Sequence, residues 1–312
     1  MLRRDFLYML GANTLAAATA SNLLAGETLD ALRAKKNLTA GDIKHYLRSL
    51  HYVKEPSCDQ IIVGDENRPV TKLGTTWMGY WRTCKKAVEA GINTLVVHEP
   101  TFYSHWDLGD QSARYRRDKL AETAYEKTIA EKRKWIEDNG LTIIRCHDVL
   151  DRVAEIGIPF ALGQALGFAN TDIVRSRPCY NVYGIEPRPA SEVARHIAAQ
   201  LAAFRQPGVA FYGDEDRTIK TVGVGTGCIC DPVQFASLNP DLFIAIDDSV
   251  NTWIQTTYAE DSGHPLVIIN HGASEEPGMK LLAGHLSEAF PNVPCEHIGD
   301  GCSFKWFPAD QG

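Results

Sequence analysis

The sequence predicts an α/β fold built from two αβ lobes with mixed sheets. From about Thr39 onward, segments with a helical spacing of apolar residues alternate with short apolar runs of the strand type. Glycines stand where two of the helices would end, after residues 81–90 and after residues 121–139. This alternation is typical of sheets whose strands are joined by helices.

The first half of the folded region opens with a helix. Thr39 is a suitable N-cap for it, and Ile43, Leu47 and Leu50 share one helical face. The next segments are a helix and the strand after it, and then a long charged helix with its own strand. In order, we expect a helix over 81–90 after the one over 39–50, then a strand over 92–100, a helix over 121–139, a strand over 141–146 and a helical segment over 147–157.

The second half repeats this rhythm. We expect a strand over 180–186, a helix over 190–204, strands over 209–213 and 219–227, a helix near 231–238, a strand over 242–247, a helix near 250–259, a strand over 266–270 and a helix through 275–290. Pro187 and Pro189 make 178–190 the best place for a seam between two lobes.

The N-terminus differs from the rest in composition. A basic start precedes a mildly apolar stretch and small residues that end at Ala18-Thr19-Ala20, the order of a secretory signal. Arg3-Arg4 followed by Asp5-Phe6-Leu7 resembles the twin-arginine signal, with which bacteria export folded proteins. The stretch is too polar for a comfortable membrane span. We expect residues 1–34 to be signal and leader, residues 35–312 to be the folded domain, and the protein to be periplasmic or otherwise extracytoplasmic without stable membrane insertion.

Composition narrows the function classes. The chain of 312 residues has a formal net charge of −7 and no Lys/Arg stripe with interleaved aromatic residues. We therefore expect no nucleic-acid partner. Its eight cysteines also lack the paired CxxC spacing of structural zinc sites.

Three strand-to-helix junctions carry residues of metal-binding type. In open α/β sheets, ligands bind at the carboxyl ends of strands. A spacing of four also places two side chains on one face of a helix. One such junction is common by chance, but three together point to a site for zinc, iron or manganese. The pairs are His98-Glu99, His147 with Asp151, and His271 with Glu275.

Two other stretches invite weaker interpretations. The stretch "GVGTG" at 223–227 is better explained as a tight glycine turn than as a phosphate cradle, because it lacks the Walker and dinucleotide patterns. His105 and Asp107 either line a pocket beside the first junction or belong to a solvated loop.

Four ordered motifs give the chain a resemblance to a known family. They are "IIVGDENRPVTKLGTTW", "VVHEPTFY", "CHDVLD" and "NHGASEEPG", and "DLFIAIDD" precedes the last of them. On these residues the sequence resembles the Ngg-interacting-factor-three-like dinuclear metal-centre family, homologues of GTP cyclohydrolase I type 2. The resemblance extends over most of residues 40–305. It implies a toroidal homohexamer and a centre of two divalent metal ions, either iron, manganese or zinc.

The resemblance also implies roles for residues. His147 would be a ligand, or would orient a ligand or shuttle a proton, and Glu275 would have a catalytic role besides binding metal. Two positions depart from the family pattern: Glu99 replaces the second His of a His-His pair, and Asn270 replaces a Gly before the last His. Since a carboxylate is harder than an imidazole, Glu99 shifts the preference toward iron or manganese. The implied metal ligands are His98, Glu99, Asp151, His271 and Glu275.

Two functions from different classes stay open at this point. The first is a metal-dependent hydrolase, in which two ions about 3.5–4 Å apart activate a bridging water. The resemblance implies a purine-like ring as its small-molecule substrate, and another cyclic amidine, an amide or a phosphoester is equally open. The second is a non-catalytic hexameric metal-binding scaffold or interaction protein. A solvent position on the metal favours the hydrolase, and full coordination by protein favours the scaffold.

Overall fold

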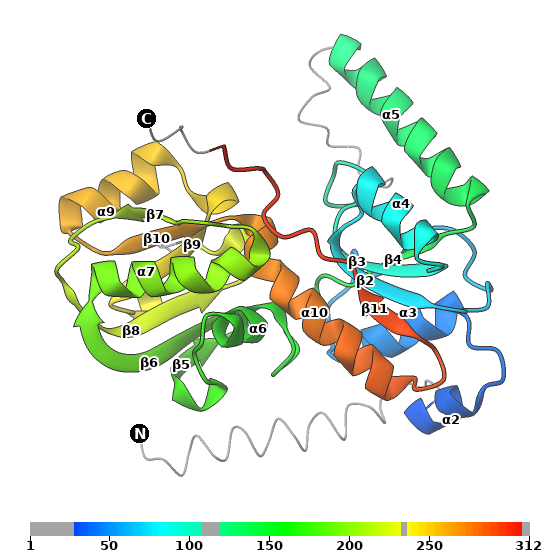
Figure 1. Ribbon diagram of the computed structural model, residues 1–312, viewed down its shortest axis with the longest axis horizontal. Coiled ribbons are helices and arrows are strands. Elements are labelled where there is room, and N and C mark those ends of the chain that lie inside the picture. Colours follow the sequence, from blue (N-terminus) through cyan, green and yellow to red (C-terminus); the bar gives the residue numbers. More distant parts are fainter. Residues whose placement is uncertain (1–27, 108–118, 232–235, 308–312) are drawn as a thin grey trace. The chain divides into compact units, whose positions relative to one another are not determined.

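The computed structural model describes residues 28–107, 119–231 and 236–307. These residues form two compact units. The first contains the described residues up to Leu150 together with Ala283–Ile298, and the second contains Asp151–Leu282 together with the residues from Gly299 onward. Each unit has its own mixed sheet (Figure 1). The expected α/β class with two mixed sheets is therefore confirmed.

The first unit is built on a five-stranded sheet. All neighbouring strands in it are parallel except β1 and β4. Strands β3 and β4 are buried along their whole length, which explains why both are continuous apolar runs in the sequence. Since they are parallel, with Val97 opposite Arg145, their carboxyl ends lie at one edge of the sheet. In spatial order the strands are β1 (Ile61–Val63), β4 (Thr142–Arg145), β3 (Thr94–Glu99), β2 (Leu73–Met78) and β11 (Cys295–His297).

The helices of the first unit follow the predicted caps and apolar faces. The expected N-cap is confirmed: the Thr39 hydroxyl accepts a hydrogen bond from the Asp42 N–H, and the Asp42 carboxylate accepts one from the Thr39 N–H. The helix that follows buries Ile43 and Leu47. The four helices are α2 (Leu29–Ala34), α3 (Ala40–Ser49), α4 (Trp81–Glu89) and α5 (Lys119–Asp138).

The second unit is built on a six-stranded sheet. Strands β8, β9 and β10 are parallel to one another, and the remaining pairs are antiparallel. Helices α6 (Ile158–Ala165) and α7 (Ala190–Leu201) pack on this sheet through β6 and β8. In spatial order the strands are β5 (Ile173–Arg177), β6 (Tyr180–Pro189), β8 (Thr218–Gly225), β9 (Leu242–Ile246), β10 (Leu266–Ile269) and β7 (Ala210–Tyr212).

Short helical elements and one long helix complete the described chain. The long helix is α10 (His271–Ala289), which begins directly after β10. Its residues up to Leu282 belong to the second unit, and the rest belong to the first. The short elements are η2 (Asn170–Asp172), η3 (Ala202–Phe204), η4 (Gly227–Ile229), η5 (Ala236–Leu238), η6 (Asp247–Ser249), the π-helix η7 (Thr252–Thr256) and α9 (Thr257–Ser262).

The expected helical segment over 147–157 is wrong, because these residues form turns. The carboxylate of Asp59 accepts hydrogen bonds from the backbone N–H groups of His147, Asp148 and Val149. Glu155 adopts a left-handed conformation at φ +69°, which an α-helix cannot include. The seam expected near 178–190 falls on β6, whereas the two units divide at Leu150 and Asp151.

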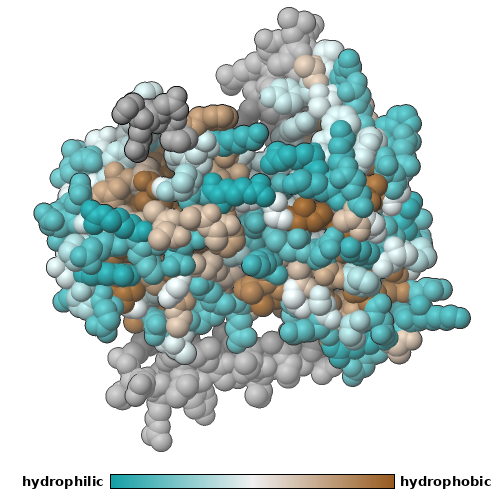
Figure 2. Space-filling view, in the orientation of Figure 1, coloured by the Kyte–Doolittle hydropathy of each residue, from teal (hydrophilic) through white to brown (hydrophobic). Residues whose placement is uncertain are grey.

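Hydrophobic side chains gather mainly inside the units. On the face that Figure 2 shows, hydrophilic residues predominate and hydrophobic residues form small separate groups. No helix in the described part of the chain is both long and apolar enough to cross a membrane.

Candidate metal centre

The predicted site residues fall into two sets, one in each unit. His98, Glu99 and His147 belong to the first unit. Asp151, His271 and Glu275 belong to the second.

In the first unit, the end of β3 carries two of the predicted ligands into the protein interior. His98 is fully buried and Glu99 is 8% exposed. Nδ1 of His98 lies 3.0 Å from the Cys146 carbonyl oxygen, which can only accept a hydrogen bond. The proton of a neutral His98 ring is therefore on Nδ1, and Nε2 carries the lone pair that a metal would use.

His147 lies beside this pair, on the turn that Asp59 holds. Its ring stacks on the His98 ring, with centroids 4.6 Å apart. Nε2 of His147 is 3.7 Å from Glu99 Oε1, while Nδ1 is 3.0 Å from Asp148 Oδ1. One donor atom from each of His98, Glu99 and His147 lies within 4.8 Å of the other two. These three residues, of which His98 and Glu99 are buried and His147 is partly exposed, form an N/O set of the kind that zinc, iron and manganese bind.

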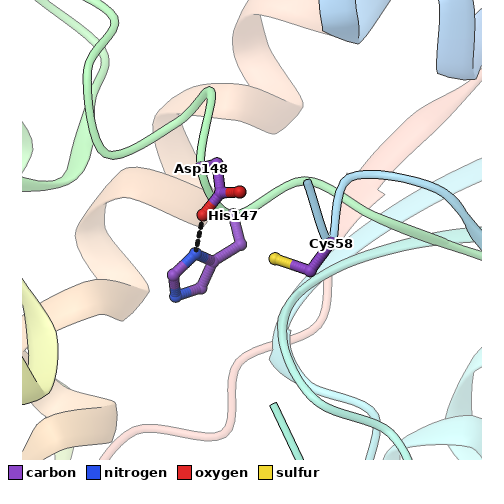
Figure 3. A group of neighbouring side chains, drawn as sticks. All are labelled: Cys58, His147 and Asp148. Carbon is purple, nitrogen blue, oxygen red and sulfur yellow. Dashed lines mark hydrogen bonds and ion pairs between the residues drawn. The ribbon is translucent and has the colours of Figure 1, made fainter. Parts of the chain in front are cut away.

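A thiol adds another type of donor next to His147. The donor atoms of Cys58, His147 and Asp148 lie within 4.8 Å of one another. Figure 3 shows the His147 ring turned toward Asp148, with the Cys58 sulfur pointing toward them. Asp148 also accepts a hydrogen bond of 2.8 Å from the Ser57 hydroxyl. Asp148 is thereby held in place to orient the His147 ring, the usual role of a carboxylate behind a metal-binding histidine.

Arg145 joins the ligands of this unit to the loop that follows them. It is 1% exposed, and its Nε donates to the His98 carbonyl oxygen over 3.0 Å. Its Nη1 donates to the His105 carbonyl oxygen and lies 3.4 Å from Asp107 Oδ2. Its Nη2 lies 3.5 Å from Glu99 Oε2. The loop through His105 and Asp107 is therefore packed around a buried arginine.

The electrostatics of the loop reflect this burial. Burial raises the pKa of the Asp107 carboxyl, against the opposing effects of Arg145 and of the backbone N–H groups of Thr101 and Phe102. His105 is an exposed residue, and the partial burial of its ring together with the Arg145 charge lowers its pKa. Near neutral pH the His105 ring is therefore mainly uncharged.

In the second unit, the first turn of α10 presents the predicted pair. Nε2 of His271 is 3.1 Å from Glu275 Oε2, the i,i+4 partner, so the expected helical pairing is confirmed. Nδ1 of His271 is 2.7 Å from Asp248 Oδ2. Asp247 accepts hydrogen bonds from the His271 N–H over 3.0 Å and from the Asn270 amide over 2.8 Å. It therefore holds the start of α10.

Asp151 reaches the same pair in the second unit. An Asp151 oxygen lies within 4.8 Å of a Glu275 oxygen, and Asp151 Oδ1 accepts a 2.8 Å hydrogen bond from the Thr226 hydroxyl. The neighbouring Gly227 has φ +42°, and a Cβ built there would lie 3.1 Å from His271 Nε2 and closer than 3.0 Å to Glu275 Oε1. The glycine turn after β8 leaves open the space beside these two donors.

Both sets fit divalent metal ions. In all three histidines Nδ1 faces an oxygen acceptor, which leaves Nε2 to bind an ion. In both sets carboxylates accompany the imidazoles, and the ligand residues are nearly all buried. The buried His, Glu and Asp residues can therefore bind metal.

Sequence reasoning missed three contributors. Arg145 was visible as a charge inside the apolar run "LTIIRC", and Gly227 as the last glycine of "GVGTG". Asp59 left no local signal, because the amides it binds are 88 to 90 residues away. Glu276 accepts from the N–H groups of Asp300 and Gly301, so it holds the C-terminal segment.

One known protein is similar to this chain along most of its length. The chain is 22% identical over 268 residues to the GTP cyclohydrolase 1 type 2 homolog of Chlamydia muridarum (strain MoPn / Nigg), covering 84% of this chain and 96% of that protein.

Solved structures share the fold. Staphylococcus aureus hypothetical protein SA1388 superposes with a TM-score of 0.68 at 18% identity, covering 87% of this chain and all of that one. A Bacillus cereus protein related to NIF3 gives 0.65 at 15% identity, with 88% of this chain and all of the other covered. The profile of the family described as Duf34/NIF3 (NGG1p interacting factor 3) matches residues 59–299. The chain therefore belongs to the Duf34/NIF3 family.

Proposed function

We propose that the protein is a metal-dependent hydrolase with a dinuclear centre. His98, Glu99, Asp151, His271 and Glu275 would supply the ligands for two divalent ions of iron, manganese or zinc. The observation that carries the proposal is the common orientation of the histidines: each has Nδ1 on an oxygen and leaves Nε2 for a metal. Such fixed rings are the usual arrangement behind metal-binding imidazoles.

Bound divalent ions would lower the pKa of a water toward neutrality and polarise the bond that it attacks. The residues of the chain would prepare this chemistry. His147 has two alternative roles: it would bind an ion through Nε2, or, outside the ligand set, it would hold or pass a proton at Nε2 while the Asp148 carboxylate at Nδ1 stabilises the charged ring. Glu275, which is 1% exposed, offers a carboxylate shielded from bulk water.

The substrate is proposed at the level of a chemical class. The name of the curated relative, GTP cyclohydrolase 1 type 2 homolog, supports a purine-like ring. Another cyclic amidine, an amide or a phosphoester would suit the same type of centre.

Metal content tests the proposal first. Protein purified without chelators or added metal would be measured by elemental mass spectrometry, with wild type compared with Glu275→Ala and His271→Ala. About two ions per wild-type chain and fewer in both variants are expected. One ion or none per wild-type chain would contradict the proposed dinuclear centre. A substrate screen with wild type would follow. Loss of turnover of the substrate found, in Glu275→Ala with an unchanged melting temperature, would support the hydrolase.

A non-catalytic hexameric metal-binding scaffold is the second candidate. Its supporting observation is the exposure of large aromatic side chains, with Trp253 at 85% and Phe307 at 86%, since aromatic residues are enriched where proteins meet. Light scattering of wild type and Glu275→Ala separates the two candidates. A hexamer that dissociates on loss of Glu275 favours the scaffold, and a persistent oligomer with lost turnover favours the enzyme.

Export by the twin-arginine route is also proposed, with a periplasmic or other extracytoplasmic location. Arg3-Arg4 and the rest of the expected signal lie outside the described residues. Replacement of both arginines by lysine should keep the protein in the cytoplasm. Unchanged export of that variant would contradict the proposal.

A further inference from the structure

Arg145 is a charged residue in an unusual place. It ends β4, a strand buried at every position, and its side chain has no exposed surface. A buried charge is costly unless it is paired and its donors are satisfied. Its guanidinium contacts the His98 and His105 carbonyl oxygens and the carboxylates of Asp107 and Glu99, which all lie in the stretch from His98 to Asp107. The guanidinium therefore serves the segment that carries Glu99.

The two carboxylate oxygens of Glu99 have different neighbours. Oε2 faces the guanidinium, 3.5 Å from Nη2 of Arg145. Oε1 lies near a different group, 3.7 Å from Nε2 of His147. One oxygen thus lies next to a permanent positive charge, and the other lies next to a nitrogen that can bind a metal.

We propose that Arg145 is a positioning residue that makes Glu99 a metal ligand through Oε1 alone. The guanidinium holds Oε2, so Glu99 neither chelates one ion with both oxygens nor bridges two ions. This inference rests on the proposed metal centre, and it assigns to Arg145 a function that an imidazole at position 99 would not require.

Charge balance gives the pair a second effect. Glu99 and Asp107 are both buried carboxylates within reach of one guanidinium. When Arg145 is present, the three groups together carry one negative charge rather than two. The guanidinium therefore offsets the repulsion between the two buried carboxylates and holds one of them next to the proposed metal ligands.

Infrared spectroscopy of the carboxylate stretches tests the binding mode directly. The separation of the asymmetric and symmetric stretches is larger for a carboxylate bound through one oxygen than for a bridging one. Difference spectra would be recorded for the full chain with and without Mn²⁺, and Glu99→Gln would identify the Glu99 bands. In wild type we expect the large separation. In Arg145→Gln we expect it to narrow, because Oε2 is released and can also reach an ion.

The affinity for Mn²⁺ gives an independent readout. Arg145→Gln should weaken Mn²⁺ binding by about 10–100-fold, the usual effect of removing a group that orients a ligand. Arg145→Lys keeps the charge and should recover part of this loss. Arg175→Gln is the matched control, since Arg175 also donates to backbone carbonyls, those of Leu238 and Asn239, away from the predicted ligands.

If Arg145→Gln folds poorly, the stability of the metal-free variants still tests the role of Arg145. Glu99→Gln and the double variant Glu99→Gln/Arg145→Gln would be compared by urea denaturation without metal. If Arg145 stabilises Glu99, the double variant is more stable than Arg145→Gln alone, because it lacks the buried carboxylate that Arg145→Gln deprives of its guanidinium.

The outcomes separate this inference from the proposed function. A wild-type protein that binds no metal would overturn both. Metal binding by wild type with a bridging Glu99, or with the same Glu99 bands and affinity in Arg145→Gln, would overturn the role of Arg145 and leave the metal centre intact. A large wild-type separation that narrows in Arg145→Gln, with recovery in Arg145→Lys, would support it.

Discussion

Replacement of Gly227 by alanine should displace a metal ligand and should cost the fold no more than the same substitution at a matched glycine. A Cβ at this position would lie closer than 3.0 Å to Glu275 Oε1, whereas an ordinary contact is 3.4–4 Å. The difference requires the oxygen to move by at least about 0.4 Å, which is twice the roughly 0.2 Å tolerance of metal–ligand distances. Glu275 is 1% exposed, so neighbouring atoms restrict where its carboxylate can go. We therefore expect weaker metal binding.

Gly263→Ala is a matched control for the backbone. Gly263 has φ +64°, close to the +42° of Gly227, but the nearest atom to its added Cβ is Asp214 Cβ at 3.8 Å. Both variants place alanine in a left-handed conformation, which costs about 1–2 kcal/mol. The atom that the Gly227→Ala methyl meets most closely is the end of a side chain, so the two free energies of unfolding should be similar. Metal affinity should fall about tenfold or more only in Gly227→Ala.

Two measurements are needed for this comparison. Urea denaturation of the metal-free proteins gives the free energies of unfolding, and titration with Mn²⁺ or Zn²⁺ gives the affinities. If Gly227→Ala binds the ion as tightly as Gly263→Ala does, the open space beside His271 and Glu275 has no bearing on metal binding. The assignment of this pair as ligands would then be refuted.

Three further predictions concern other parts of the described chain. Asp148→Asn should weaken metal binding by about 10–100-fold, because the His147 ring loses its carboxylate partner; an unchanged titration would contradict this. Burial tends to raise the pKa of Asp42, but its hydrogen bonds from Lys35 and Thr39 prevail and lower it. The stabilisation from Asp42 is therefore complete above the unfolded pKa of about 3.9 and is lost as the pH falls through the folded pKa. Between about pH 5 and pH 2, the free energy of unfolding measured with urea should therefore fall less for Asp42→Asn than for wild type. Gly163→Ala should destabilise the second unit by about 1–3 kcal/mol in a thermal melting measurement, because its Cβ would meet the buried Tyr183 ring closer than 3.0 Å. Gly208→Ala is the control, because a Cβ added there would have no atom within 4 Å; equal stability of the two variants would contradict the prediction.

The parts of the site that the sequence predicted depend on local structure. His98 and Glu99 end a strand, and His271 and Glu275 are one turn apart on a helix. A periodic pattern reports such relations directly, because it depends on residues that are close in the chain. The alternation of helices and strands is predictable for the same reason.

The parts that the sequence did not predict depend on distant residues. His147 and Asp151 have helical spacing, yet Asp59 captures the amides that would start a helix. Arg145 is recognisable as a site residue only when β3 and β4 are paired. Neither relation is encoded in a window of neighbouring residues, so the spacing of four between His147 and Asp151 predicted the wrong local structure.

The capture of three amides by Asp59 has a consequence for the thermodynamics of metal binding. The turn that carries His147 is ordered by a side chain of the protein, so its conformational entropy is lost during folding and not when an ion arrives. Hydrogen exchange at His147, Asp148 and Val149 should therefore be slow with or without metal. Metal uptake at His147 would then resemble the filling of a rigid receptor, with little change in backbone order.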